Sequence, residues 1–429
     1  MIIKDISNEK LGEKYFKIKH PSGLTIFIMP KEDYSSTYAV FATKYGSIDN
    51  IIKRKDGSFV DIPAGTAHFL EHKLFESEDL DAFARFAQTG ANANAYTGFD
   101  RTAYLFSCSS NFKENLEILL DFVQSPYFTQ ETVEKEQGII GQEIRMYKDS
   151  AMWEVMFNLL MALYRVHPVR IDIAGTEESI AQITADTLYD CYKSFYNLKN
   201  MALAVVGNVT VEDVLETADK LLKSGNGEKA QRKFTLESPE PVKTYTEEKL
   251  AVNTEQFLLG FKENITTPEL TLKEKIGSQI ALEATSGKAS HLYKKLFDSE
   301  LINTSFSHEH FNGFGYSAAL FGGETKDPQK ATQVIKAEIK NILTKGIPEI
   351  DFKRAKRKLY GRMIMQYNDI DDLANNLIET HFNNNGLFDE IEICKSVTLD
   401  YANQRLNELL NEQYSALSVI KPLSCEKEA

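Results

Sequence analysis

Residues 68–72 read His-Phe-Leu-Glu-His, and their types and spacing suit them to metal-assisted chemistry. In a helix of about 3.6 residues per turn, His68 and His72 lie one turn apart with Glu71 on the same face. Imidazoles are good zinc ligands, and a carboxylate beside an activated water is suited to act as a general base. The pattern therefore predicts a zinc site with a catalytic base beside it.

The same pattern has a simpler interpretation, in which two histidines pack beside a surface glutamate without binding a metal. The chain has 8 histidines and 62 acidic residues in 429. By composition alone, His, acid and His would occur at these offsets roughly 0.02 times. Composition therefore explains the pattern poorly, and a third ligand elsewhere in the chain would favour the metal site.

A catalytic zinc takes three protein ligands and leaves its fourth position to water. Residues 129–149 predict an amphipathic helix with Thr129 as its N-cap. Apolar side chains recur there at helical spacing, at Val133, Ile140, Ile144 and Tyr147. This helix carries Glu136 and Glu143, seven residues apart and therefore on one face. Only one of the two carboxylates can bind the same ion, and the spacing does not say which.

The motif, its flanks at 65–67 and 73–75, and residues 138–140 resemble the insulinase/pitrilysin family of inverted zinc metallopeptidases. The chain is similar to the short bacterial form, which is related to mitochondrial processing peptidase. The resemblance implies one Zn2+ per chain, held by His68, His72 and Glu143. It also implies that Glu71 is the catalytic base. By the same resemblance, Glu136 is a supporting acid at the catalytic site that orients a ligand or the substrate.

Residues 90–107 resemble the family's edge strand, against which a substrate peptide lies. The resemblance implies that the substrate-binding residues are Asn94, Ala95 and Tyr96. An edge strand has free backbone donors and acceptors, so it can pair with an extended peptide whatever its side chains. The alternative is a plain amphipathic strand that follows a Gly/Asn turn.

Two halves of the chain have similar patterns. Strand-like residues 24–29 and 201–207 in the first half have counterparts at 255–261 and 414–420 in the second. We expect an α+β fold of two homologous domains, each a mixed β-sheet packed against helices. The predicted boundaries are an N-terminal catalytic domain with the zinc site (1–223), a linker (224–242) and a C-terminal homologous domain without a metal site (243–429).

The second half departs from the family's metal helix, because residues 290–297 carry lysine where an acid and a histidine would be needed. His308 and His310 could share a strand face and form a metal pair, although surface histidines are the simpler interpretation. The resemblance also implies an arginine and, seven residues later, a tyrosine in this half. Glycine stands at those positions, near Gly315 and Gly322.

We therefore expect a zinc-dependent endopeptidase that cleaves short or unfolded peptides inside a chamber formed by two subunits. The missing arginine and tyrosine favour a heterodimer with a zinc-less homologous subunit that supplies them, and a homodimer is the alternative. Two other functions remain open. One is a non-catalytic peptide-binding or scaffolding subunit of such a heterodimer, and the other is a zinc hydrolase acting on a different substrate.

The composition of the chain indicates which cellular compartment and which binding partners to expect. A net charge of −13 disfavours nucleic acid and anionic membranes as partners. We find no apolar run long enough for a membrane span and no leader-like start, so we expect a cytoplasmic protein. The scattered cysteines suit a reducing compartment, and we expect no disulfide. These cysteines are Cys108, Cys191, Cys394 and Cys425.

Overall fold

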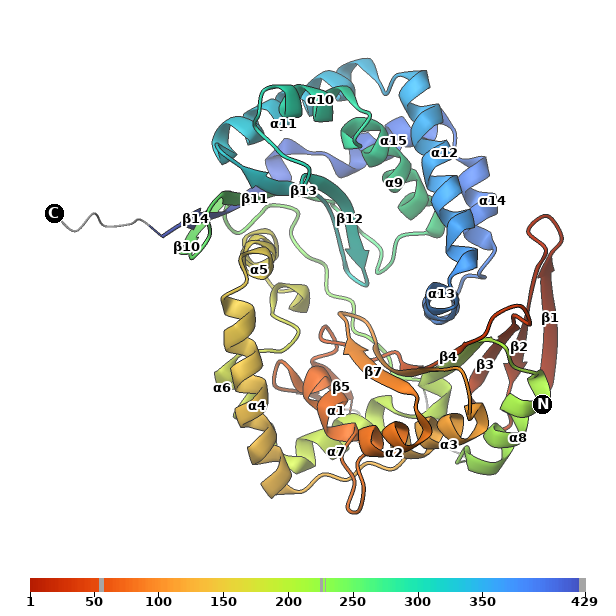
Figure 1. Ribbon diagram of the computed structural model, residues 1–429. Helices are drawn as coiled ribbons and strands as arrows, with labels where there is room; N and C mark the ends of the chain where they lie inside the picture. The colour runs from red at the N-terminus through yellow and green to blue at the C-terminus, as the bar shows by residue number, and fades with distance from the viewer. Residues whose placement is uncertain (54–57, 224–226, 228, 424–429) are drawn as a thin grey trace. The chain divides into compact units, whose positions relative to one another are not determined.

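The computed structural model describes residues 1–53, 58–223, 227 and 229–423. Part of the predicted linker (224–226 and 228) and Cys425 lie outside the described residues. The chain forms two compact units, which can be followed in Figure 1. The first unit comprises residues 1–144, 172–232 and 365–388, and the second comprises residues 145–171, 233–364 and 389–429.

The first unit is built on a mixed sheet, whose described strands run in the order β1-β2-β3-β9-β4-β8-β7. They are β1 (Ile2–Asn8), β2 (Glu13–Lys19), β3 (Thr25–Pro30), β4 (Thr37–Thr43), β7 (Asn92–Thr97), β8 (Thr102–Cys108) and β9 (Met201–Gly207). Strand β3 is parallel to β9, and the other neighbours are antiparallel. A separate pair is formed by β5 (Ile51–Lys53) and β6 (Phe59–Asp61).

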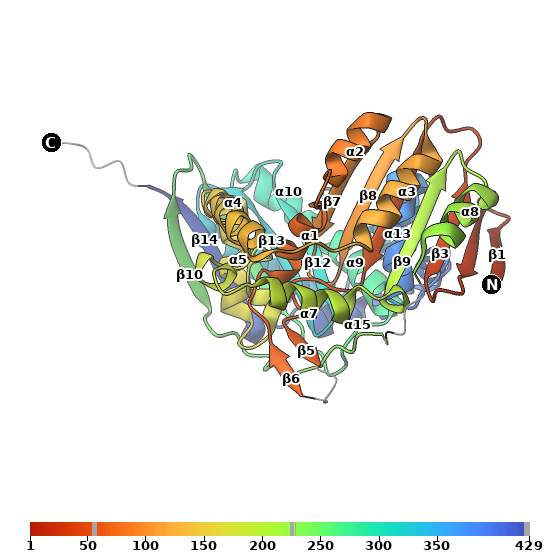
Figure 2. The same cartoon turned by 90° about the horizontal axis from the view of Figure 1, so that it is seen from below.

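Alternation along β3 gives this sheet two apolar faces. Ile26 and Ile28 belong to the main hydrophobic core, which includes residues of helices α3 (Phe112–Val123) and α8 (Val211–Leu221). Phe27 points the other way and contacts the ring of His381 in α13 (Ile370–Phe382). Figure 2 shows α3 and α8 on the near side of β8, β9 and β3, with α13 behind them. Helices therefore cover both faces of the sheet.

The other helical segments of the first unit surround the core and the site. They are α1 (Thr66–Leu74), α2 (Ala82–Thr89), α6 (Glu177–Ile180), α7 (Ala185–Phe195), and the short 3-10 turns Leu198–Asn200 and Gln366–Asn368. Helix α4 (Gln130–Lys148) begins in this unit and continues into the second.

The second unit repeats the plan with a five-stranded sheet, in the described order β10-β14-β11-β13-β12. Its strands are β10 (Tyr245–Leu250), β11 (Glu255–Lys262), β12 (Ser307–Gly313), β13 (Tyr316–Thr325) and β14 (Ser415–Pro422). Strand β10 is parallel to β14, so this sheet is mixed as well. Its helical segments are α5 (Ala151–Leu163), Pro168–Arg170, α9 (Leu272–Ser286), α10 (His291–Asp298), α11 (Pro328–Lys345), α12 (Glu349–Met365), α14 (Asp389–Ser396), α15 (Leu399–Leu409) and Glu412–Tyr414. The predicted α+β class with two sheet-and-helix halves is confirmed.

Helix α5 lies directly on the second sheet. At Gly260 of β11, an added Cβ would lie 2.8 Å from Leu163 and 3.0 Å from Leu159, so glycine permits the close approach of the helix. Ala151 and Val155 of the same helix pack against Ile420 of β14. Burial of these apolar side chains explains why residues 145–171 belong to the second unit.

The two units exchange covering helices. Helix α5 precedes the predicted linker in sequence but covers the second sheet, and α13 follows the linker but covers the first. The predicted linker at 224–242 lies between the strands of the first sheet and those of the second. The compact units, however, place residues 145–171 in the second unit and residues 365–388 in the first.

Two further observations concern the cysteines and the helices. Cys108, Cys191 and Cys394 are buried free thiols. Of the helices that the structure describes, none combines the length and the apolar character needed to cross a membrane.

Candidate metal and catalytic site

Helix α1 is held firmly in the first unit by its buried side. Phe69, Leu70 and Leu74 belong to the main hydrophobic core. Gly65 precedes the helix with a φ of 88°, and an added Cβ there would lie only 2.4 Å from the carbonyl oxygen of Ala174. Only glycine fits this left-handed, crowded position. The start of the helix, and with it the direction of its polar face, is fixed by packing.

The predicted ligands meet at one point. The Nε2 atoms of His68 and His72 lie 3.6 and 3.5 Å from Oε2 of Glu143, which comes from α4. The two imidazole rings stand edge to face with centroids 4.6 Å apart. The ligand atoms of the three residues all lie within 4.8 Å of one another. Among the described residues, this is the one group of three or more His, Cys, Asp or Glu side chains arranged in this way.

These separations fit a tetrahedral zinc ion. With metal–ligand bonds of about 2.1 Å, two ligand atoms of a tetrahedron lie about 3.4 Å apart. The observed 3.5 and 3.6 Å match that edge and exceed the usual length of an N–H···O hydrogen bond. Two imidazoles and a carboxylate are also a donor set that zinc prefers. The residues present therefore fit the ion that the sequence predicts.

Glu136 lies directly behind one of these ligands. Its Oε1 is 3.0 Å from Nδ1 of His72, and its side chain is buried. An ionised carboxylate can only accept, so Nδ1–H donates and the Nε2 lone pair is left facing Glu143. Burial disfavours the charged imidazolium of His72, but the hydrogen bond to Glu136 and the nearby carboxylates outweigh this and raise its pKa. Of the two α4 carboxylates, Glu143 therefore faces the ligand cluster and Glu136 supports it.

Glu71 lies on the same helix face as the ligands. Its Oε2 accepts a hydrogen bond of 2.5 Å from Oγ1 of Thr97, the last residue of β7. Burial raises the pKa of the Glu71 carboxyl, and the hydrogen bond from Thr97 and the neighbouring His68 and His72 offset this only in part. The structure thus places the predicted base beside the predicted ligands.

The predicted substrate residues lie on an edge strand. Strand β7 is at the end of the first sheet and pairs along one side with β8. Asn94 is exposed, and its side chain accepts from the amide of Ala95. The hydroxyl of Tyr96 donates to Asn375 of α13. Among the described strands β7 has no partner on its other side, so that edge is open for pairing with a peptide, but Tyr96 is engaged with the covering helix.

The sequence patterns did not identify Thr97 as a candidate site residue. It directly follows Asn94, Ala95 and Tyr96, so its closeness in sequence was visible. The side-chain alternation of a strand indicated that Thr97 shares a face with Ala95. The approach of β7 to α1, which brings Thr97 to Glu71, is a tertiary contact without a local signal.

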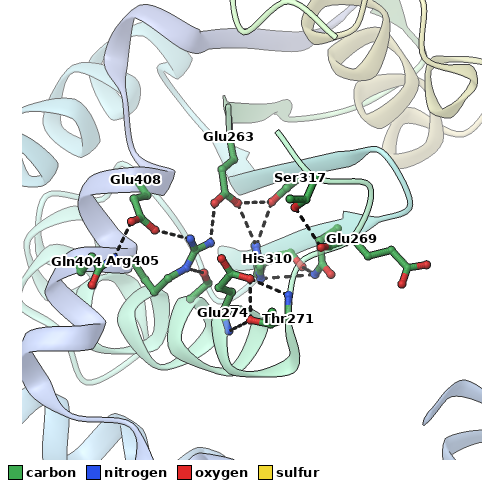
Figure 3. A network of polar contacts seen from close by, with 12 residues as sticks. Glu263, Glu269, Thr271, Glu274, His310, Ser317, Gln404, Arg405 and Glu408 are labelled. Atoms are coloured by element: carbon green, nitrogen blue, oxygen red, sulfur yellow. Dashed lines mark hydrogen bonds and ion pairs between the residues drawn. The ribbon is translucent and has the colours of Figure 1, made fainter. Parts of the chain in front are cut away.

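The interpretation of the β12 histidines as surface residues was wrong for His310, which is buried, whereas the side chain of His308 is 17% exposed. His310 is buried, and its Nε2 donates to Oγ of Ser317, which in turn donates to Glu263 (Figure 3). Arg405 completes this network with a contact of 2.6 Å to Glu263. His308 lies 3.7 Å from Glu283. The polar residues around His310 satisfy one another and form a structural network.

Comparisons with known proteins show which family the chain resembles. Residues 55–177 match the family model described as Insulinase (Peptidase family M16), and residues 182–359 match the model described as Peptidase M16 inactive domain. The chain is 38% identical over 433 residues to the uncharacterized zinc protease YmfH of Bacillus subtilis (strain 168), covering 98% of this chain and 99% of that protein. The crystal structure of an M16-like peptidase from Alicyclobacillus acidocaldarius is similar, with a TM-score of 0.91 and 33% identity over 99% of each chain.

A third relative is the Arabidopsis thaliana protein named "Probable mitochondrial-processing peptidase subunit beta", 28% identical over 37% of this chain and 30% of that protein. Together, the fold, the clustered ligands and these matches define a zinc-protease-like member of the inverted metallopeptidases. The chain belongs to the insulinase family of peptidases, M16.

Proposed function

We propose that the chain is a zinc-dependent endopeptidase that cleaves short or unfolded peptides. The observation that carries the proposal is the convergence of His68, His72 and Glu143 at 3.5–3.6 Å, with Glu71 on the same helix face. The 38% identity to a protein named as a zinc protease supports the same class of reaction. The edge strand β7 supports the substrate class, because a free edge pairs with extended backbone and a folded strand is already paired.

The mechanism follows from the arrangement of the side chains. A zinc ion held by His68, His72 and Glu143 would polarise the scissile carbonyl and lower the pKa of a water molecule. Glu71 takes the proton of the attacking water and returns it to the leaving amine. Glu136 holds the His72 ring so that its Nε2 atom keeps its direction.

The proposal includes a second subunit. The family's arginine and tyrosine would fall near Gly315 and Gly322, and neither position has room for a side chain. Gly315 has a φ of 84°, with an added Cβ 2.8 Å from Nε2 of His167, and an added Cβ at Gly322 would lie 2.3 Å from the carbonyl oxygen of Phe257. This supports a heterodimer with a homologous subunit that lacks the metal motif and supplies the pair around a shared chamber.

A homodimer is the competing assembly. Light scattering on the purified chain, alone and mixed with such a homologue, measures which complex forms. Peptide cleavage that requires the second chain would support the heterodimer, whereas full activity of the chain alone would contradict it. We place the enzyme in the cytoplasm, whose reducing conditions suit the free thiols of Cys108, Cys191 and Cys394.

The first experiment measures cleavage of a mixed library of unstructured peptides by the chain, alone and with the homologous subunit. Zinc is quantified in the same samples. Glu71→Gln is the test variant, and Glu78→Gln, at an exposed position after α1, is the matched control. Cleavage that depends on Glu71 and not on Glu78 supports the proposal. Bound zinc with no cleavage in either assembly would overturn it and leave a peptide-binding subunit.

A further inference from the structure

The base and the peptide-binding strand are joined by one hydrogen bond. We propose that Thr97 is a positioning residue, whose hydroxyl orients the Glu71 carboxylate and ties it to the strand on which the peptide lies. The proposal rests on the proposed peptidase function. Its basis is the contact of 2.5 Å between Oγ1 of Thr97 and Oε2 of Glu71.

The direction of this hydrogen bond is set by the neighbour of Thr97. Thr102 lies opposite Thr97 in the β7–β8 register, with the two hydroxyl oxygens 3.5 Å apart. Thr102 is fully buried and donates its single hydroxyl hydrogen to the carbonyl of Tyr45 at 2.9 Å. It therefore has no hydrogen left for Thr97. The hydrogen of Thr97 is free to go to Glu71, whose ionised carboxylate can only accept.

This contact makes the two oxygens of the carboxylate different. Oε2 is occupied by Thr97, and no described residue donates a hydrogen bond to Oε1. One oxygen is therefore anchored and the other remains available to a water molecule. A glutamate without the anchor would rotate about its terminal torsion, which has a broad profile, and would present its oxygens in many directions.

The anchor is itself rigid. Thr97 is β-branched, so its χ1 torsion has few accessible rotamers, and it ends a strand that pairs with β8. Glu71 belongs to α1, the helix that also carries His68 and His72. One hydrogen bond thus connects the element carrying two metal ligands with the element that receives the peptide. A peptide paired with β7 and the base that deprotonates the attacking water would then be held in a fixed relative orientation, which is what catalysis by orientation requires.

The test compares Thr97→Val, which keeps the shape and loses the hydroxyl, with Thr97→Ser, which keeps the hydroxyl. Thr344→Val, on the exposed side of α11, is the matched control. The variants are assayed in the assembly in which the wild type cleaves an unstructured peptide, and kcat, KM and zinc per chain are measured. General bases contribute about 10²–10⁴-fold, so partial disorder of one should lower kcat about ten- to hundredfold. We expect this loss in Thr97→Val with KM and zinc within about twofold of wild type, and recovery in Thr97→Ser.

Other outcomes overturn the inference in different ways. Wild-type kcat in Thr97→Val would show that the hydroxyl is dispensable, and an equal loss in Thr97→Ser would assign the effect to the methyl group. A raised KM with unchanged kcat would make Thr97 a peptide contact. Crystal structures of the wild type and Thr97→Val provide a readout independent of activity, and an unmoved Glu71 carboxylate in the variant overturns the inference. If the wild type cleaves no peptide, the proposed function fails, and these structures still decide the role of Thr97.

Discussion

The Nδ1 atom of His72 lies 3.0 Å from Oε1 of Glu136, and the Nε2 atom of the same ring lies 3.5 Å from Oε2 of Glu143. One imidazole is therefore held between two carboxylates of a single helix, one on each ring nitrogen. Glu136 and Glu143 share one helix face but contact different ring nitrogens, so the first can orient the ring and the second can bind the metal. This arrangement leads to a first prediction.

Glu136→Gln should weaken zinc binding without abolishing it. Glutamine can still accept from Nδ1–H, but without a negative charge it makes the imidazole a poorer ligand. Loss of such an outer partner typically costs about 10–100-fold in metal affinity. Competition with a chromogenic chelator measures the affinity. Glu134→Gln, exposed on the same helix, is the control, and an equal loss in both variants would contradict the assignment.

Removal of a ligand should have a different result from removal of the base. His72→Ala and Glu143→Ala should lose both zinc and peptide cleavage, because only two ligands remain. Glu71→Gln should retain about one zinc per chain and lose turnover by about 10²–10⁴-fold. Elemental analysis and a peptide assay on the same samples check this. A Glu71→Gln protein with wild-type cleavage would refute the mechanism.

The second unit should lose stability in mild acid through His167. Its Nε2–H donates to the carbonyl of Phe314 at 3.0 Å, and its Nδ1 accepts from the amide of Val169 at 3.1 Å, so the folded protein needs the neutral ring. Burial lowers the pKa of His167 to about 4, from a usual value near 6.5. As pH falls below about 6.5, the unfolded chain takes up the proton first, so stability is lost until about pH 4.

The expected loss of unfolding free energy across that range is about 3 kcal/mol. Trp153, the single tryptophan of the chain, stacks on Tyr147 in the second unit and reports its unfolding in urea. His167→Gln retains one donor and one acceptor and does not titrate there. The difference in unfolding free energy between wild type and variant should therefore depend on pH, and parallel curves would show that His167 does not contribute.

The buried ion pair of the network around His310 should be costly to break. Arg405 lies 2.6 Å from Glu263, and both side chains are at most 5% exposed. Burial alone would raise the pKa of Glu263, but His310, Arg405 and Ser317 together hold it at about 2. Arg405→Met leaves that charge without its cation and should cost about 3–5 kcal/mol. Urea unfolding followed by Trp153 fluorescence measures the loss.

An exposed ion pair gives the control for this experiment. Lys294 and Asp298 are 2.7 Å apart, with side chains 74% and 58% exposed. Lys294→Met should change the unfolding free energy by less than about 1 kcal/mol. In addition, the double variant Glu263→Gln/Arg405→Met should be less destabilised than the sum of its single variants, because the second change removes the stranded charge.

Local patterns predicted the parts of the fold that depend on local spacing. The helix expected over 129–149 is α4 (Gln130–Lys148), and the strand expected over 201–207 is β9. The clustering of His68 with His72 follows from helical periodicity alone. The choice of Glu143 over Glu136 as the expected ligand did not follow from periodicity, because both lie on one helix face. It came from the family resemblance, and in the structure Glu143 is the one that faces both histidines.

Features that depend on contacts between distant segments were not predicted. The approach of Thr97 to Glu71 requires β7 to pass beside α1. The local sequence of neither element indicates that the two will be in contact. The burial of His310 depends on Glu263 and Arg405, which are 47 and 95 residues away. The covering helices α5 and α13 lie on the opposite side of the linker from the sheets they cover, so order along the chain did not reveal where they pack.

This exchange of helices makes the two halves of the chain complementary fragments. Residues 1–223 alone would lack α13, so the face of the first sheet that includes Phe27 would be exposed to water. Residues 243–429 alone would lack α5, so the face of the second sheet at Gly260 would be uncovered. Each fragment also carries the helix that the other lacks. A chain divided in two should therefore fold fully only when both fragments are present, so the half that carries His68, His72 and Glu143 needs the other half to cover its sheet.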